Sequence, residues 1–523
     1  ICFLTLICLL LSAASSQAGY QVIFTPRFSV TPEYTDNLFS SNEDEEQEYI
    51  TVISPGFTVQ ILEKTRGATL SYDLGYSCYD SSPEFNTLRH NSQLSGWIRF
   101  TRHTRLEFQN RFVLTEESVT KLEESETEDE VVKPEKQYVA EKETVRKTKE
   151  YYYTNDADIA FTHQFGESDV FNMKYAYGIL ENEDPTIEDR TTHNPAADVT
   201  YWIMPKQLSM TAGASYTRDE FSSTEEDPSY WEESVNPHMG LSYWFKPDEF
   251  GIETEISYTS GEYLSKSDML KHWYESINPS LSLVYKYVPY HLELEGNLSH
   301  TIGRFSDPSD DFDNWNGSVS LSKKFTKKIE GFVRYAHAIM DFKGNNENYS
   351  IYDPSVGITY TVAEDTPLSL SVGYFVRDRQ TSPDEAAMSV NGDIGKTWPV
   401  GRYGSISFKT SSGYDEDYFG AEKMGFGVYY EADFTAKYAF YKDIIGDVSG
   451  SYKKDKFKDL EITRDDETKE IGAGLSFQKK WGTIRFDYTY RTLDSTLSEN
   501  DYEENRIRWQ IMLSPSRPIR LFQ

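Results

Sequence analysis

The chain has 523 residues and carries 85 Asp and Glu against 52 Lys and Arg, so its formal net charge is −33 and its pI about 4.7. A chain this acidic lacks the basic surface that binds phosphates, which excludes nucleic acid as a partner. Its mean hydropathy is −0.62 and 15% of its residues are aromatic. These values are wrong for a bundle of membrane helices but fit membrane strands, which show lipid only every second residue.

The first 18 residues have the composition of a signal peptide. Ile1 to Leu11 are apolar and uncharged, and small residues follow up to Ala18, which predicts cleavage after Ser16-Gln17-Ala18. The basic start is missing, so we expect a signal peptide over 1–18 that is truncated at its front. Cys78 is the one cysteine left after cleavage, and no intramolecular disulfide is expected.

The mature segment, 19–523, begins with alternating strands. A first strand is predicted from Tyr20 to Thr31 and a second one ending near Leu62, joined by an acidic link. The stretch from Ala68 to Tyr79 alternates Leu, Tyr or Cys with Thr, Ser, Asp or Gly without a break. Side chains of a strand alternate between its two faces, so this stretch has one apolar and one polar face.

The same alternation continues to the end of the chain, for example from Phe171 to Ile179, from Leu368 to Val376 and from Ile507 to Leu513. The connections are alternately short and long, and the long ones hold most of the Asp, Glu and Ser. This rhythm is typical of an outer-membrane barrel with short periplasmic turns and long outer loops. We therefore predict an all-β fold: one transmembrane antiparallel up-and-down β-barrel of about 24 strands, within a range of 20 to 26.

A proline repeat runs through the predicted strands. The five prolines share the register of the lipid-facing residues, and three of them are spaced by 42 residues; they are Pro55, Pro195, Pro237, Pro279 and Pro354. Because proline has no backbone N–H, each is predicted to mark a bulge or bend at one height on alternate strands.

The segment 115–150 is a charged insertion, with an acidic first half and a mixed Lys/Glu second half. Three interpretations remain open: a disordered outer loop, strands that extend above the membrane, or a segment that folds into the lumen as a constriction. Charge runs are usually solvated, which favours the first.

Charged residues inside predicted strands fall on the polar face. On the lipid face a charge near the midplane would cost about 2–4 kcal/mol, so these side chains should line the lumen and interact with a transported solute. The candidates are Asp73, Arg99, Glu107, Arg111, Glu253, Glu255, Glu293, Glu295, Arg485 and Asp487. The net acidity has two open interpretations, an acidic outer rim or a lumen that favours cations.

The first strands resemble a known family. Ser29 to Phe39 reads Ser-Val-Thr-Pro-Glu-Tyr-Thr-Asp-Asn-Leu-Phe, and Ile50 to Gly56 reads Ile-Thr-Val-Ile-Ser-Pro-Gly. This pattern resembles the outer-membrane β-barrels, porin-like in type, that are associated with exosortase (PEP-CTERM) and exopolysaccharide loci. The resemblance implies an outer-membrane barrel and polysaccharide export, and it brings no catalytic residues with it.

No motif for catalysis, a cofactor or a metal stands out. The 9 His residues have no short metal-ligand spacing, and no cysteine pairs remain. His163 and His300 fall in the lipid-face register, where an outer-membrane lipase would need His beside Ser, but the pattern gives this little weight. We expect no enzyme activity, no cofactor and no metal site.

The sequence thus predicts a protein of the Gram-negative outer membrane that contacts lipid, a hydrophilic solute or polysaccharide, and periplasmic export partners. One hypothesis is a channel that passes solute or polymer. The other is a non-conducting structural or adhesive barrel whose loops bind a surface polymer or partner. Trp97, Trp202 and Trp244 fit either a stack on sugar rings inside the barrel or an interface girdle, and the girdle is favoured.

Overall fold

The computed structural model describes most of the chain. Described are residues 20–42, 45–116, 149–224, 228–265, 269–344, 346–363, 366–394, 398–400, 403–417, 425–457, 464–496, 501–515 and 517–522. The predicted signal peptide and residues 117–148 of the charged insertion lie outside these ranges, so both predictions stay as they are.

Strands make up nearly all of the regular structure. They are β1 (Gln21–Thr35), β2 (Glu48–Leu62), β3 (Arg66–Tyr79), β4 (Thr87–Thr101), β5 (Thr104–Thr115), β6 (Tyr152–Gln164), β7 (Val170–Asn182), β8 (Arg190–Met204), β9 (Leu208–Phe221), β10 (Tyr230–Lys246), β11 (Phe250–Leu264), β12 (Lys271–Tyr287), β13 (Leu292–Phe305), β14 (Phe312–Lys324), β15 (Ile329–Phe342), β16 (Tyr349–Ala363), β17 (Thr366–Arg379), β18 (Glu385–Ile394), β19 (Trp398–Val400), β20 (Gly404–Asp417), β21 (Gly425–Tyr441), β22 (Ile444–Phe457), β23 (Arg464–Lys479), β24 (Gly482–Ser495), β25 (Tyr502–Leu513) and β26 (Ile519–Phe522). Within the described ranges there are also three 3-10 turns, Pro83–Phe85, Val288–Tyr290 and Pro308–Asp310.

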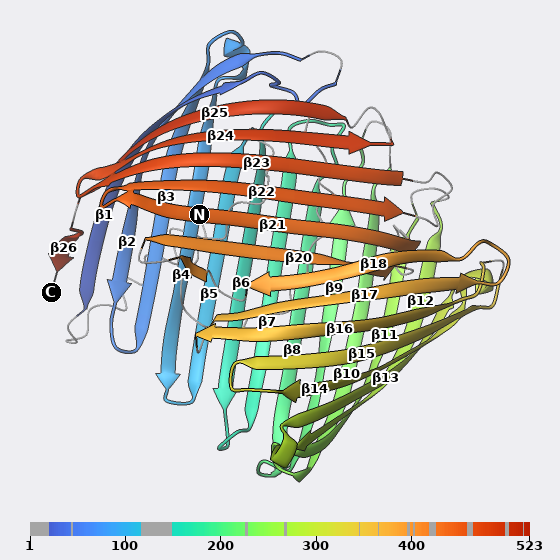
Figure 1. Ribbon diagram of the computed structural model, residues 1–523. Coiled ribbons are helices and arrows are strands. Elements are labelled where there is room, and N and C mark those ends of the chain that lie inside the picture. Colours follow the sequence, from blue (N-terminus) through green and yellow to red (C-terminus); the bar gives the residue numbers. More distant parts are fainter. Residues whose placement is uncertain are drawn as a thin grey trace.

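These strands form one antiparallel sheet that closes on itself. β18 and β19 pair in turn with β20, and β25 and β26 pair in turn with β1, so each of these pairs occupies one position in the sheet. The 26 strands therefore fill 24 positions, and the predicted barrel of about 24 strands is confirmed. Figure 1 shows the closure, where the blue strand β1 lies beside the red strand β25.

The two ends of the barrel differ in their connections, as the sequence predicts. One end, called here the short-turn end, holds tight connections such as Arg102–His103 between β4 and β5. The other, the long-loop end, holds the acidic connections, such as that between β1 and β2. In the described part of the chain no helix is long and apolar enough to cross a membrane.

The repeated prolines interrupt the ladder on one side only. Pro279 lies opposite Ile256 of the preceding strand, but the pairing with the following strand stops at Ile277 and resumes at Ser280. The same two-residue gap, with no register shift, occurs at the other four prolines. The missing N–H thus opens the ladder towards the next strand without adding a residue, so the expected bulge is absent and a local ladder gap takes its place.

Candidate functional site

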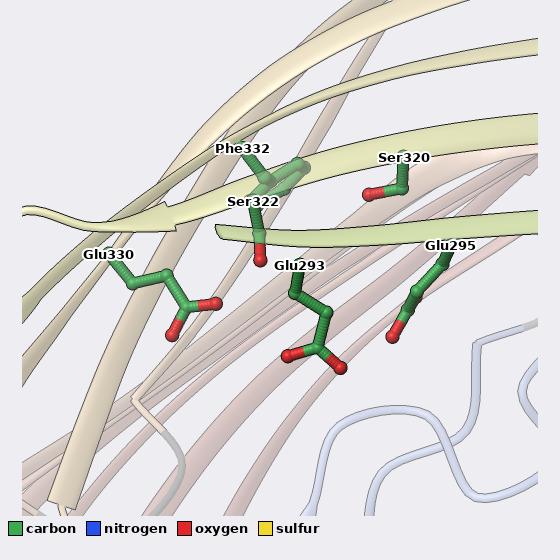
Figure 2. Close-up of a pocket in the computed structure, with 6 residues that line it drawn as sticks. All are labelled: Glu293, Glu295, Ser320, Ser322, Glu330 and Phe332. Atoms are coloured by element: carbon green, nitrogen blue, oxygen red, sulfur yellow. The ribbon is translucent and has the colours of Figure 1, made fainter. Parts of the chain in front are cut away.

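The polar faces of neighbouring strands coincide around the barrel. Ser71, Gln93, Arg111 and Asp156 lie opposite one another in successive strands from β3 to β6. All ten predicted lumen residues share this face. The opposite face carries large exposed apolar side chains, among them Val333, Val319 and Leu475. Figure 2 shows Glu293, Glu295 and Glu330 projecting from the polar face into the space that the barrel encloses.

The first part of this inner wall, from β22 through the closure to β5, holds its charges in pairs. Arg27 Nε donates to Asp73 Oδ1 over 2.5 Å, across the intervening strand β2. At the crossing point stands Gly56, where an added Cβ would lie 1.9 Å from Asp73 Oδ1. A glycine is needed there because the ion pair passes directly over the backbone.

Arg485 is the centre of a second network on this wall. Its two terminal nitrogens lie 3.1 Å from the two carboxylate oxygens of Asp447, and its Nε donates to Asp487 over 2.7 Å. Nearby, Glu33 is buried and accepts from Arg508 over 2.9 Å. Bidentate pairs of this kind fix both side chains and cancel their charges locally.

Arg99, Glu107 and Arg111 also lie on this wall, on β4 and β5. The guanidinium groups of Arg99 and Arg105 lie 5.6 Å and 5.7 Å from the centre of the Trp97 ring. Arg105 also pairs with Glu107 over 2.5 Å. Trp97 therefore sits on the inner face, as do Trp202 and Trp244, which lie opposite Ser209 and Gly251. The interface girdle, which the sequence analysis favoured for these three tryptophans, is therefore wrong, because girdle residues face lipid and these side chains face the interior.

A second part of the wall, on β11 to β15 near the short-turn end, has surplus negative charge; we call it the acidic wall. It carries the carboxylates Glu253, Glu255, Glu293, Glu295 and Glu330, against three cations on the same face, Lys286, Lys324 and Arg334. Lys286 lies 3.1 Å from Glu293, and Lys324 lies 3.9 Å from Glu330. Glu253, Glu255 and Glu295 are exposed and have no ion-pair partner among the described residues. Carboxylates in this state need water beside them.

The interior at the long-loop end is apolar instead. A buried cluster, called here the inner core, gathers side chains of the inner face; its members are Tyr263, Tyr274, Phe305, Phe312, Ala338, Met340, Phe342, Tyr349, Ile351 and Phe375, joined by Phe426 and Val428. Phe426 and Ile351 are completely buried, and Phe375 is 1% exposed. Such burial inside a wide barrel requires a second layer of chain.

The ends of β20 and β21 supply that layer. Tyr414 and Phe426 share a strand face with Phe408 and Phe434, which are exposed on the outside of the barrel. Yet the Tyr414 ring lies 5.1 Å from Phe375 of the inner face, and the Phe426 ring lies 6.1 Å from Tyr349. The long-loop ends of β20 and β21 therefore turn into the barrel and pack their outer face on the inner face of β15 to β17.

This inward turn begins where β20 leaves β18. The two strands pair only at Gly392–Thr410 and Asp393–Lys409. Beyond that point side chains replace the ladder: Val390 N donates to Ser412 Oγ over 2.7 Å, and Ser412 N donates to Asn391 Oδ1 over 3.0 Å.

Arg377 fastens the two layers together. Its guanidinium lies 4.1 Å from the ring centres of both Tyr349 and Phe426, and it is 2% exposed. It pairs with Glu385 over 3.3 Å, while Tyr349 donates to Glu416 over 2.5 Å. The sequence analysis missed this arrangement. The sequence feature that could have revealed the inner core is a set of apolar residues at strand ends, such as Ile351 and Phe375, in positions where the alternation predicts polar side chains.

The two histidines weighed for catalysis lie on the outer face. His300 stacks on Trp315 at 3.9 Å, and His163 accepts or donates a bond with Thr104 Oγ1 over 2.9 Å. Within the described ranges, no three His, Cys, Asp or Glu side chains gather closely enough to hold a metal ion.

With this geometry in place, comparisons with known proteins decide the family. Residues 16–149 and 369–514, more than half of the chain, match the family described as "Putative beta-barrel porin 2". The chain belongs to this family. No curated protein matches the sequence.

Solved structures share the fold of this porin-like outer-membrane barrel. A variant of the ferric enterobactin receptor of Pseudomonas aeruginosa is 9% identical, with a TM-score of 0.52, over 95% of this chain and 82% of that one. The FrpB iron transporter of Neisseria meningitidis (F5-1 variant) is 10% identical, with a TM-score of 0.50, over 95% and 81% of the two chains. At such low identity these likenesses show the barrel fold alone.

Proposed function

We propose that this porin-like barrel is an outer-membrane channel that passes a hydrophilic solute or polymer and favours cations. The observation that carries the proposal is the acidic wall, where Glu253, Glu255 and Glu295 are exposed on the inner face without ion-pair partners. A carboxylate keeps its charge there only if water reaches it, and a line of such charges raises the local concentration of cations. Export of exopolysaccharide, with periplasmic export partners, extends this proposal through the resemblance of the first strands.

Single-channel conductance of the refolded protein in a planar bilayer tests the proposal. We expect stable steps in the nanosiemens range, with a reversal potential in a salt gradient that shows preference for cations. If a shift in gel migration on heating shows that the protein is folded, but the protein gives no conductance steps, the channel proposal is contradicted.

A specific observation supports the second candidate, a non-conducting structural or adhesive barrel. The inner core brings part of the chain into the interior at the long-loop end and so reduces the space there. On this hypothesis the loops bind a surface polymer or partner, conductance is absent, and trimming the outer loops abolishes function. The two hypotheses therefore differ in the same bilayer measurement.

A further inference from the structure

We propose that the acidic wall binds pyranose rings, so that the transported molecule is a neutral or amino-sugar oligosaccharide and not an anionic one. This inference rests on the proposed function, because it places a saccharide path on the wall of the same channel. It is carried by two aromatic rings that lie against this wall, Trp244 and Phe332, and by the polar groups beside them.

Phe332 borders a recess of about 260 Å³ on the inner face, lined otherwise by Glu293, Glu295, Ser320, Ser322 and Glu330. Figure 2 shows the three carboxylates pointing from this recess into the open interior. A sugar ring has an apolar face of C–H groups and an edge of hydroxyls. The recess offers a match for both, since the ring presents a negative π-face and the carboxylates and hydroxyls accept hydrogen bonds.

Each ring reaches over a glycine of the neighbouring strand on the inner face. A Cβ added to Gly251 would stand 2.8 Å from two ring carbons of Trp244, and one added to Gly357 would stand 2.3 Å from Phe332 Cζ. Each glycine thus makes room for a ring against the wall. A ring held in this way turns its other side towards the interior, where a sugar can stack on it.

The two rings bracket the carboxylates. Trp244 is on β10 and Phe332 on β15, five strand spacings or about 24 Å apart along the wall. Glu253, Glu255, Glu293 and Glu295 lie on the strands between them, and all six residues are near the short-turn end. A strip of this length accommodates several consecutive sugar rings, and its surplus negative charge repels uronate or sulfated sugars.

A ring that covers a glycine is not by itself a binding site. Phe440 covers Gly446 in the same way, with a Cβ-to-ring distance of 2.5 Å, but it is 66% exposed on the outer face. Its ring therefore lies on the side of the sheet opposite to the carboxylates of the acidic wall. Phe440 therefore serves as the matched control for Phe332, and the outer-face Trp509 serves as the control for Trp244.

The test is block of the channel current by maltohexaose, a neutral hexasaccharide, and by hexagalacturonate, an anionic one, with isothermal titration of both sugars in detergent micelles. We expect maltohexaose to bind and to block, and hexagalacturonate to do neither. Trp244→Ala and Phe332→Ala should each raise the half-blocking concentration of maltohexaose about tenfold, as loss of one aromatic contact predicts. Phe440→Ala and Trp509→Ala should leave it unchanged.

The outcomes separate this inference from the channel itself. Conductance without binding of maltohexaose overturns the saccharide path and leaves the channel standing. Titration heat for maltohexaose that is lost in Trp244→Ala, in a protein that never conducts, supports saccharide binding on the wall and contradicts the channel. Equal losses in the inner-face and outer-face variants also overturn the saccharide path.

Discussion

The inner face of this barrel carries exposed carboxylates on β11 to β15 near the short-turn end and a buried apolar cluster at the long-loop end. On the acidic wall, Glu253, Glu255 and Glu295 are exposed on the inner face. In the inner core, Phe375 and Phe426 occupy the same interior but are fully shielded from water. Both regions are built from strands of one continuous sheet, so the strand fold alone does not decide the character of the lumen.

The difference teaches that apolar residues are tolerated inside a barrel where the chain itself covers them. Inner-face residues of a wide barrel normally meet water and are polar. Here the long-loop ends of β20 and β21 leave β18 and add a second layer, which buries the inner-face residues of β15 to β17 against Tyr414 and Phe426. The interior of the barrel is therefore narrowed at the long-loop end and lined by charge on β11 to β15 at the other end.

The largest expected effect comes from removing the ring at the centre of the inner core. Phe426→Ala should destabilise the barrel by about 3–5 kcal/mol, because it leaves a cavity between the two layers. Urea unfolding in detergent micelles measures this, and single-channel conductance should rise as the layer loosens. Phe434→Ala is the control on the same strand and the same face, where the ring is exposed to the outside, and it should cost about 1 kcal/mol or less. Equal costs for the two variants would mean that the second layer is absent.

A smaller effect is expected at the guanidinium that joins the layers. Arg377→Met keeps the stem of the side chain but removes the contacts with Tyr349, Phe426 and Glu385, and it should cost about 2 kcal/mol. Arg377→Lys should recover only part of this, since an ammonium cannot lie flat between two rings. Arg379→Met is the control, because Arg379 pairs with Glu347 over 2.8 Å in a loop and lies farther, at 3.8 Å, from Glu385, so it should cost about 1 kcal/mol or less. If Lys fully replaces Arg in the same unfolding assay, the stacked geometry is unimportant.

Charge reversal on the acidic wall tests the other side of the comparison. The double substitution Glu293→Lys and Glu295→Lys should lower the ratio of cation to anion permeability about tenfold, as read from reversal potentials. The change should shrink in 1 M salt, where the screening length falls to about 3 Å. Glu84→Lys, in the exposed Pro83–Phe85 turn, makes one such charge reversal away from the wall and should alter the ratio little. If neither substitution changes the ratio of cation to anion permeability, the ions do not pass along the acidic wall.

The face on which each strand residue lies could be predicted from the sequence, because alternate residues along a strand point to opposite faces of the sheet. The alternation from Leu368 to Val376 places each side chain on the face where the structure has it, and the barrel of about 24 strands follows from counting such stretches. The partner of a charge could not be predicted in the same way. Arg27 reaches Asp73 across a third strand, and only Gly56, a small residue on the polar face between them, hints at the crossing.

The inner core escaped prediction for a related reason. Phe426 alternates in step with Phe434, so the pattern assigns both to the outside. The alternation determines on which face of a strand each side chain lies, but it does not determine the path of the strand after it leaves its neighbour. That departure depends on side chains such as Asn391 and Ser412, which bond across the gap and look like ordinary inner-face and outer-face residues in the sequence.

The smallest expected effect concerns the loops above the inner core. Glu347 accepts bonds from the backbone N–H groups of Thr381 and Ser382 and pairs with Arg379 over 2.8 Å, which ties the β15–β16 loop to the β17–β18 loop. The hydroxyl and backbone bonds from Thr381 and Ser382 hold the pKa of Glu347 well below its usual range. A carboxyl whose pKa is lowered by folding stabilises the folded loops above its unfolded pKa of about 4.3, and this contribution is lost as the pH falls further.

Amide hydrogen exchange at Thr381 and Ser382, corrected for intrinsic rates, should therefore stay slow from neutral pH down to about pH 5 and quicken only below about pH 4. Glu347→Gln should exchange faster than the wild type above about pH 4 and lose the acid dependence, because an amide is a weaker acceptor and does not titrate. Asp384→Asn, in the same β17–β18 connection, controls for a general effect of lost charge and should keep the acid dependence. Slow exchange in Glu347→Gln would mean that the loops are held from the inner core below, through Phe375 and Arg377, and not by the carboxylate that bridges them.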